Sequence, residues 1–355
     1  MKKKQIWYIF LLAALCSIPA AAQSNTLWMV QEPSNTTNSG AIAYSPDGRL
    51  VASGRGDSDD VHIRNAKTGE LIRTLSGRDN NPNVIAFSPN GLYLATGTGG
   101  GGSTLNLNLW RVSDGLRLVG RIGAFTNGTN GASFSPDSQL LVVSGFHNTS
   151  YKIYHVPDMT LVSTIANFDP DLGYSVRIND VQYSPDGQII ALADTRSIKL
   201  RNAADGSLIR TINTNSPNTM PTTSIKFTPD GRFVAGGVTK LDPTYSTCIE
   251  CRIKMFSVPD GALVHTFSVG AGIPDAKIGF SSDGKVIGAG FPDEGSTYGG
   301  SNAFWQVNNE KLLRRDQRAF WVQSFAYAPS ANLFAFYGAD GVVSVMRAPL
   351  ALSDD

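Results

Sequence analysis

Short apolar runs, each about as long as one β-strand, alternate with turn residues along most of this chain of 355 residues. Many of these runs end in an aromatic residue that Ser-Pro-Asp-Gly or a close variant follows, as in residues 183–187. Proline presets φ for a tight turn and Asp-Gly tolerates left-handed backbone, so the phrase predicts a turn between two strands. Seven copies, the last two altered, recur at intervals of 43 to 53 residues. Their leading aromatic residues are Tyr44, Phe87, Phe134, Tyr183, Phe227, Phe280 and Tyr327.

Each copy stands at the same place in a predicted series of four strands. In the fourth copy, the turn leads into an apolar second strand at residues 189–191, and a third strand follows at 198–201. A second turn, with Gly206, leads into a fourth strand at 208–212. Four short antiparallel strands make one blade, and seven such units at this period predict an all-β, seven-bladed β-propeller.

The two ends of the chain predict how the ring closes. The seventh repeat supplies only three strands, at residues 322–327, 333–337 and 342–346. One strand at residues 26–30 precedes the first repeat and has no other place. We expect residues 27–30 to pair into blade seven as its fourth strand, because closure removes an unpaired edge. Residues 23–355 are then a single propeller domain.

The first 22 residues have the pattern of a signal peptide. Lys2, Lys3 and Lys4 precede an apolar stretch at residues 6–15, and small residues at 20–22 predict cleavage after Ala22. An uncleaved anchor and a lipoprotein signal at Cys16 are alternatives, and Leu15 stands where lipoprotein signals have a small residue. The pattern predicts export to the periplasm or the medium.

Charge beyond the leader is nearly balanced. The whole chain has 30 basic and 29 acidic residues, and removal of the three leader lysines leaves 27 against 29, a net charge of −2. This balance lacks the basic field of a nucleic-acid binder. No later segment is long and apolar enough for stable membrane insertion, and we expect a monomer.

The chain resembles the WD-repeat family over essentially all of residues 23–355. The Ser-Pro-Asp-Gly turn and the closing Gly-x-Leu-x-x-Thr-Leu pattern carry the resemblance. It implies a propeller that binds a protein or peptide. No repeat keeps the family's Trp-Asp pair at the end of the third strand, and the Gly-His pair is missing, so the resemblance does not carry over the family's Asp-His-Ser/Thr-Trp network. The tryptophan position holds Arg64, Trp110, Tyr154, Arg201, Phe256, Trp305 and Met346.

Cys248 and Cys251 are the only cysteines beyond the leader. In an exported protein they predict a disulfide, which requires that the segment form a turn, because an extended strand holds the two Cα atoms too far apart. A thioredoxin-like redox motif needs a βαβ context, and a zinc site needs a second pair of ligands. Neither pattern is present in the sequence.

Candidate catalytic or metal-binding residues are sparse. The four histidines, His62, His147, His155 and His265, are scattered over predicted strands and one loop, and the acidic run at 57–60 is typical of a solvated turn. The sequence therefore predicts no catalytic residues, no metal and no cofactor.

Two functions follow as hypotheses. The first is a non-catalytic scaffold that binds a protein or peptide, and the alternative is a propeller enzyme of the lactonase, lyase or quinone-dependent dehydrogenase type. We expect binding on the face that carries the connections between blades and between second and third strands, where residues 97–104, 238–250 and 291–301 predict long loops. Aromatic residues on such loops are typical binding anchors. The candidates are Tyr245, Tyr298, Phe168, Tyr174 and Trp321.

Overall fold

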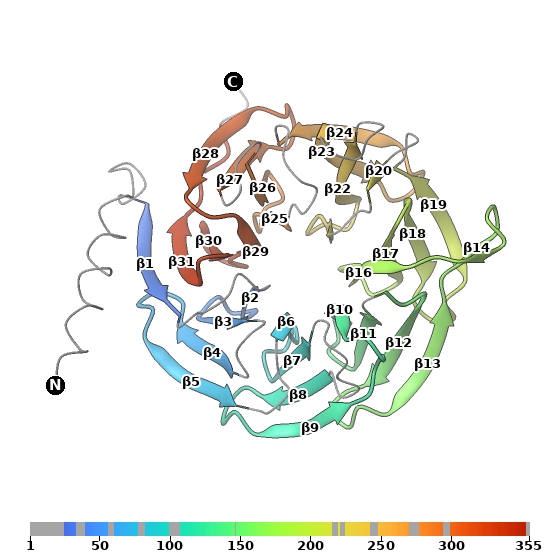
Figure 1. Cartoon of the computed structure of the whole chain (residues 1–355), viewed down its shortest axis with the longest axis horizontal. Coiled ribbons are helices and arrows are strands. Elements are labelled where there is room, and N and C mark those ends of the chain that lie inside the picture. Colours follow the sequence, from blue (N-terminus) through green and yellow to red (C-terminus); the bar gives the residue numbers. More distant parts are fainter. Residues whose placement is uncertain are drawn as a thin grey trace, which may run out of the picture.

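A computed structural model describes residues 25–32, 40–55, 60–76, 82–98, 107–145, 147–214, 219–220, 224–241, 248–269, 277–293 and 299–352. Seven antiparallel sheets stand as blades around a central axis, as Figure 1 shows. The seven-bladed, all-β propeller predicted from the repeats is confirmed.

Within each blade the strands follow one another in chain order from the centre to the rim, and β1 is the outermost strand of blade seven. Blade one has β2 (Gly40–Tyr44), β3 (Leu50–Arg55), β4 (Asp60–Asn65) and β5 (Leu71–Ser76); blade two has β6 (Pro82–Phe87), β7 (Tyr93–Thr98), β8 (Leu107–Arg111) and β9 (Arg117–Ile122). Blade three has β10 (Thr129–Phe134), β11 (Leu140–Gly145), β12 (Ser150–His155) and β13 (Leu161–Ala166); blade four has β16 (Ile178–Tyr183), β17 (Ile189–Asp194), β18 (Ser197–Asn202) and β19 (Leu208–Asn213). Blade five has β20 (Thr219–Met220), β21 (Ile225–Phe227), β22 (Phe233–Leu241), β23 (Cys248–Ser257) and β24 (Leu263–Ser268). Blade six has β25 (Lys277–Phe280), β26 (Val286–Pro292), β27 (Gly300–Gln306) and β28 (Leu312–Arg318); blade seven has β29 (Val322–Tyr327), β30 (Leu333–Gly338), β31 (Val342–Arg347) and β1 (Thr26–Gln31).

Ring closure occurs as the sequence predicts. β1 pairs antiparallel with β31, with Met29 opposite Ser344. Trp28 extends this closure into blade one, because its Nε1 donates a hydrogen bond to the Ala66 carbonyl at 2.8 Å and its ring lies against Gly69. The first strand of the described chain therefore joins the last blade to the first.

The apolar core lies between blades. In most blades the middle strands are buried, since neighbouring blades cover them; β17, for example, is buried at all positions after its first. Val234 and Phe256 of blade five belong to one buried cluster with Leu200 of blade four. Near-continuous apolar runs in second strands thus reflect coverage on both sides.

The repeated turn is held by its own side chains. In blade four the Ser184 hydroxyl donates to Asp186 Oδ1, which also accepts the backbone N–H of Gln188 at 3.0 Å. The Ser184 oxygen accepts the backbone N–H of Ile189, and Gly187 has φ of 75°. The hydrogen bond from Ser184, then that from Gln188, holds the pKa of Asp186 below its usual value. Matching Ser/Thr–Asp/Asn bonds occur at residues 45–47, 88–90, 135–137, 228–230 and 281–283.

Replacing Asp186 with alanine should lower the free energy of unfolding by about 0.5–1 kcal/mol at neutral pH, because one exposed turn loses its acceptor. A carboxylate whose pKa is lower in the folded state stabilises above its usual pKa of 3.8 and loses that effect as pH falls through the folded value. Urea unfolding at neutral pH and at about pH 2 should therefore show the difference only at neutral pH. Asp171→Ala, at an exposed loop position, is the control; an equal loss in that variant would contradict the assignment.

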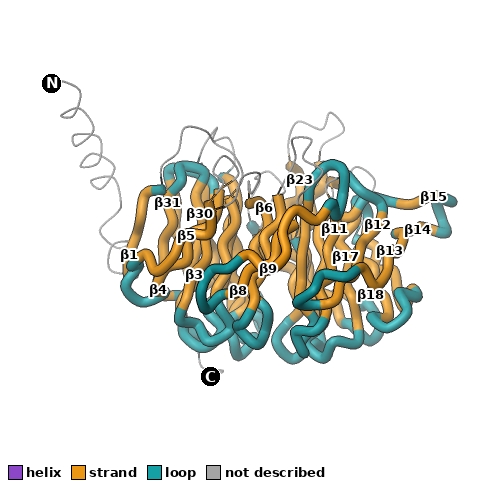
Figure 2. The backbone as a smooth tube through the Cα atoms, turned by 90° about the horizontal axis from the view of Figure 1, so that it is seen from below, coloured by secondary structure: helices purple, strands orange, loops and turns teal. Residues whose placement is uncertain are grey.

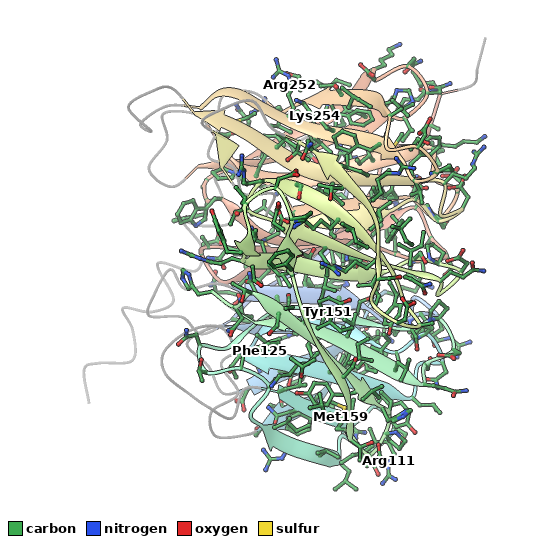
Figure 3. All side chains as sticks on the ribbon, turned by 90° about the vertical axis from the view of Figure 1, so that its right-hand side faces the viewer. Arg111, Phe125, Tyr151, Met159, Arg252 and Lys254 are labelled. Carbon is green, nitrogen blue, oxygen red and sulfur yellow. The ribbon has the colours of Figure 1, made fainter. Side chains whose placement is uncertain are left out.

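The propeller has two unlike faces. We call the side with the turns at Gly187 and Gly206 the turn face, and the side with the connections between blades and between second and third strands the loop face. Figure 3 places Arg111 towards the turn face and Phe125, in the connection from blade two to blade three, towards the loop face.

Two of the expected long loops are partly strand. β22 and β23 continue their pairing through Thr239 and Cys251, and β26 and β27 still pair at Pro292 and Gly300. The expectation of loops over residues 238–250 and 291–301 is therefore wrong at their ends, because antiparallel pairing extends these hairpins. In the remaining expected loop, residues 97–98 are the end of β7 and residues 99–104 lie outside the described residues.

The two cysteines also lie on a strand, although the sequence indicated a turn. Cys248 and Cys251 both belong to β23, and the register shift at Lys240 and Leu241 inserts one extra residue between them. Such a bulge bends and twists the strand locally. Cys251 is buried and disulfide-bonded, while the side chain of Cys248 lies outside those described, so the pairing of these two residues stays a prediction.

Candidate functional site

A small hairpin projects from the disc between blades three and four. It consists of β14 (Phe168–Asp169) and β15 (Tyr174–Ser175), and Figure 2 shows it extending beyond the edge of the ring. Asp169 holds its turn, because its Oδ1 accepts the backbone N–H groups of Asp171 and Leu172, and its carbonyl accepts that of Gly173. The hairpin thus has an internally bonded turn.

A buried lysine fastens this hairpin to blade four. Lys199 on β18 has no solvent exposure, and its Nζ lies 3.1 Å from Asp169 Oδ2 and 3.3 Å from Asp194 Oδ2. Burial alone would raise the pKa of Asp169, but the hydrogen bond and charge of Lys199, together with the backbone N–H groups of Leu172 and Asp171, outweigh it and lower that pKa. A fully buried cation with two carboxylate partners is a strong positional constraint, because separating the charges leaves one of them buried and unpaired.

Further hydrogen bonds orient the second carboxylate. Asp194 Oδ1 accepts the backbone N–H groups of Arg196 and Ser197, at 2.8 and 2.7 Å. Asn167, just before β14, donates its Nδ2 to Asp194 Oδ2 at 3.3 Å and to the Val176 carbonyl at 3.2 Å. Both ends of the hairpin are therefore bonded to the scaffold.

The hairpin exposes the two aromatic residues that sequence analysis selected. Phe168 is 50% exposed and Tyr174 is 58% exposed. Because Asp169 pairs with Tyr174 and adjacent residues on a strand point to opposite sides, Phe168 and Tyr174 lie on opposite sides of the ribbon. A partner that contacts both Phe168 and Tyr174 must therefore contact the hairpin on both of its sides. Nearby, the Arg177 guanidinium contacts the His147 ring.

The other sequence candidates are distributed differently. Trp321 is half-buried between blades six and seven, with its backbone against Gly300. Its indole N–H has no hydrogen-bond acceptor among the described residues. Tyr245 and Tyr298 lie outside the described residues, so the structure does not bring the five candidates together.

Among the described residues, a cavity lies towards each face of the central channel. The turn-face cavity measures about 630 Å³ and is lined by the repeat aromatics, such as Tyr44 and Phe134, and by prolines such as Pro136. The loop-face cavity measures about 560 Å³ and has a more polar lining that includes Asp180, Lys226 and Lys277. The two ends of the channel thus offer different chemistry.

Sequence reasoning missed both the buried lysine and the charged channel residues. Lys199 stands between apolar residues in a predicted third strand, a position that neighbouring blades cover. Asp180, Lys226 and Lys277 precede the repeat aromatics by one or three positions, on the innermost strands. A charged residue within a predicted buried or innermost strand was the sequence signal that could have indicated these residues.

Parts of the Asp-His-Ser/Thr-Trp hydrogen-bond network of WD repeats are present in altered form, although the resemblance does not imply the network for this chain. In blade two, Trp110 Nε1 donates to Thr96 Oγ1 at 2.9 Å. In blade one, Arg64 takes the tryptophan position, and its Nη1 donates to Ser53 Oγ and to Glu32 Oε1, at 3.1 and 2.6 Å. Glu32 directly follows β1, so this network joins the closing strand to blade one.

No cluster of three or more His, Cys, Asp or Glu side chains in the described ranges is arranged to hold a metal ion. Within the same residues, no helix has the length and apolarity needed to cross a membrane.

Two family models match parts of the chain. The WD domain, G-beta repeat model matches residues 69–107, and the model of eukaryotic translation initiation factor eIF2A matches residues 135–271. An uncharacterized WD repeat-containing protein of Synechocystis sp. is 28% identical over 176 residues, which cover 49% of this chain and 46% of the relative. Pre-mRNA-processing factor 19 homolog 2 of Arabidopsis thaliana is 24% identical over 172 residues, 48% of this chain and 30% of the relative. Each match spans less than half of the relative's own length.

Solved structures share the architecture. The β-propeller domain of Cps50 (Swd1) from Myceliophteria thermophila has a TM-score of 0.72 at 18% identity, covering 92% of this chain and 100% of that domain. Hydrazine synthase from Kuenenia stuttgartiensis has a TM-score of 0.73 at 15% identity, covering 90% of this chain and 98% of that chain. At these identities the likeness concerns the fold alone.

Proposed function

Because this chain is a divergent member of the WD-repeat family, we propose that it is a non-catalytic scaffold that binds a protein or peptide through its loop face. The observation that carries the proposal is the β14–β15 hairpin. It presents Phe168 and Tyr174 to solvent on a support fixed by the buried Lys199. Exposed aromatic side chains on a rigid support bind at low entropic cost, since few rotamers are frozen.

The rigid anchor distinguishes this hairpin from an ordinary surface loop. The backbone N–H groups of Asn167 and Ile178, on either side of the hairpin, donate hydrogen bonds to the preceding loop. Asp169 is paired with the buried Lys199. A partner therefore meets a surface whose shape is already set. The leader pattern supports a place of action in the periplasm or the medium, and we propose that the propeller acts there as a monomer.

The enzyme alternative rests on the channel. Asp180 and the two lysines are ionisable groups on innermost strands, where a propeller enzyme holds its reacting groups. However, both carboxylate oxygens of Asp180 already accept backbone N–H groups, from Val181 at 2.8 Å and Ile225 at 3.0 Å. This bonding favours a structural role for Asp180, and we therefore prefer the scaffold.

Replacing both Phe168 and Tyr174 with alanine should weaken partner binding by about 10-fold or more while leaving the unfolding temperature within about 2 °C. Partners first captured from the native envelope or medium are purified, and their affinity for each variant is measured by surface plasmon resonance. Leu92→Ala removes an equally exposed apolar side chain from the turn face and is the matched control.

Full binding by the folded double variant, with binding lost in Leu92→Ala, would show that the turn face is the binding surface. A Tyr245, Tyr298 and Trp321 triple alanine variant tests the other predicted anchors in the same assay. Loss of binding there, with the hairpin variant unaffected, would move the site along the loop face to blades five to seven.

A further inference from the structure

Seven residues, one from each blade, line both the turn-face cavity and the loop-face cavity. They belong to the innermost strands, which surround the channel in Figure 1, and we call them the waist ring because the two cavities share them. The waist ring consists of Ile42, Ile85, Ala132, Gln182, Lys226, Ile278 and Phe325. Five members are apolar, and the two polar members, Gln182 on β16 and Lys226 on β21, come from adjacent blades.

The two polar side chains of the waist ring are available to a ligand. Among the described residues, neither the Lys226 ammonium nor the Gln182 amide has a hydrogen-bond or ion-pair partner. The hydroxyl groups of the other residues that line the turn-face cavity are committed to hydrogen bonds within the ring or buried, as at Ser184, Thr228 and Tyr183. A molecule in this cavity therefore finds its side-chain hydrogen bonds at the waist ring.

The turn-face cavity gives access to Lys226. It measures about 630 Å³, within the range of small-molecule sites, and Lys226 is its one charged lining residue among those described. Aromatic, proline and aliphatic side chains, such as Phe134, Pro136 and Ile85, form most of the wall. A molecule that enters from the turn face thus meets an amine at the end of a largely apolar cavity.

The channel environment favours the neutral amine of Lys226. Burial lowers the pKa of this side chain, and the negative charge of Asp180 on β16 opposes that effect without cancelling it. The positive charge of Lys277 on β25 adds to the lowering. A lysine in such surroundings is a neutral amine in a larger fraction of molecules at neutral pH, and the neutral amine is the form that attacks carbonyl groups.

We propose that the waist ring binds a small apolar aldehyde covalently, through an imine with Lys226, while the Gln182 amide donates a hydrogen bond to the carbonyl oxygen. The Nζ lone pair forms the new bond to the carbonyl carbon, and the carbonyl oxygen leaves as water with the two hydrogens of the neutral amine. The step needs no oxidant or reductant, and it is reversible, so the propeller holds and releases the aldehyde. The apolar wall of the cavity selects an apolar carbonyl compound.

Reductive trapping with benzaldehyde tests the site. The full chain is incubated near neutral pH with benzaldehyde and sodium cyanoborohydride, which delivers hydride to the imine carbon and leaves a stable secondary amine. Peptide mapping by mass spectrometry then locates each label. We expect Lys226 to be labelled about 10-fold faster than Lys285, an exposed lysine of the turn face, with an advantage that shrinks above about pH 10, where exposed lysines also lose their proton.

Two variants and a larger reagent test the parts of the site. Gln182→Leu keeps the amine and should slow labelling at Lys226 about 3-fold or more, because the carbonyl oxygen loses a hydrogen-bond donor. Lys226→Met should lose that label and keep the label at Lys285. An aldehyde-bearing dextran, which is too large for the cavity, should label Lys285 without labelling Lys226.

The unmodified chain decides the proposal even where a variant does not fold. Labelling of Lys226 by benzaldehyde no faster than that of Lys285 would overturn it. Labelling of Lys226 by the dextran would overturn the enclosed site, and an unchanged rate in folded Gln182→Leu would overturn the part assigned to Gln182.

Discussion

Replacing Trp28 with alanine should lower the free energy of unfolding of the ring by about 3–5 kcal/mol, the cost typical of removing a large buried aromatic side chain. Trp28 lies on the closing strand, packs against Gly69 of blade one and donates its indole N–H to the Ala66 carbonyl. Its loss removes apolar contact and a buried hydrogen bond at the one junction where the first and last blades meet. Guanidinium unfolding followed by tryptophan fluorescence and circular dichroism measures the effect.

Trp28→Phe is the matched control, because it keeps an aromatic ring but loses the indole hydrogen bond and part of the packed ring, at an expected cost of about 1–2 kcal/mol. Deleting residues 25–31 should be more severe than either substitution, since it leaves the edge of β31 unpaired and prone to association. If Trp28→Ala unfolds within about 0.5 kcal/mol of the unmodified chain, the junction does not limit the stability of the ring.

Replacing Lys199 with methionine should cost a similar amount, about 3–5 kcal/mol, for an electrostatic reason. The substitution keeps most of the side-chain volume but leaves Asp194, which has no solvent exposure, with an uncompensated charge. It also releases Asp169, so the β14–β15 hairpin loses its tie to blade four. Partner binding should therefore weaken in this variant, even when the propeller remains folded, and urea unfolding with the binding assay measures both effects.

The neighbouring blade offers a matched control for this substitution. Lys254 on β23, labelled in Figure 3, lies opposite Thr266, as Lys199 lies opposite Thr211. Lys254 is half-buried, whereas Lys199 has no solvent exposure. Lys254→Met should change stability by less than about 1 kcal/mol. Adding Asp194→Asn to Lys199→Met should recover part of the loss, with a coupling energy of about 1–3 kcal/mol. Equal losses at Lys199 and Lys254, with no coupling to Asp194, would contradict the ion-pair account.

The candidate site was only partly predictable. Phe168 and Tyr174 were selected as exposed loop aromatics, and both are exposed, but the hairpin that carries them was not expected. Its anchor joins Asp169 to Lys199, 30 positions further along the chain, and no local pattern connects two such residues. The channel group shows the same limit, because Asp180, Lys226 and Lys277 come together only when three blades stand side by side.

The sequence by itself determined the number of blades, the order of the strands and the closure by β1. These features depend on local chemistry that repeats: an aromatic residue, a proline-led turn, and apolar runs of strand length. Blade seven was complete only when residues 26–31 were added, and counting strands was enough to show it.

Only the tertiary structure decided which charges are buried and what they contact. Lys199 and Lys254 both stand within a predicted strand, and the sequence does not distinguish them. In the structure, Lys199 is enclosed by two carboxylates, whereas Lys254 is half-buried. The strand ends in blade five were also decided in space, where continued pairing of β22 with β23 turned an expected loop into a longer hairpin. The physical reason is that strand formation and turns depend on neighbours in sequence, whereas burial, ion pairing and pairing length depend on which segments the closed ring brings into contact.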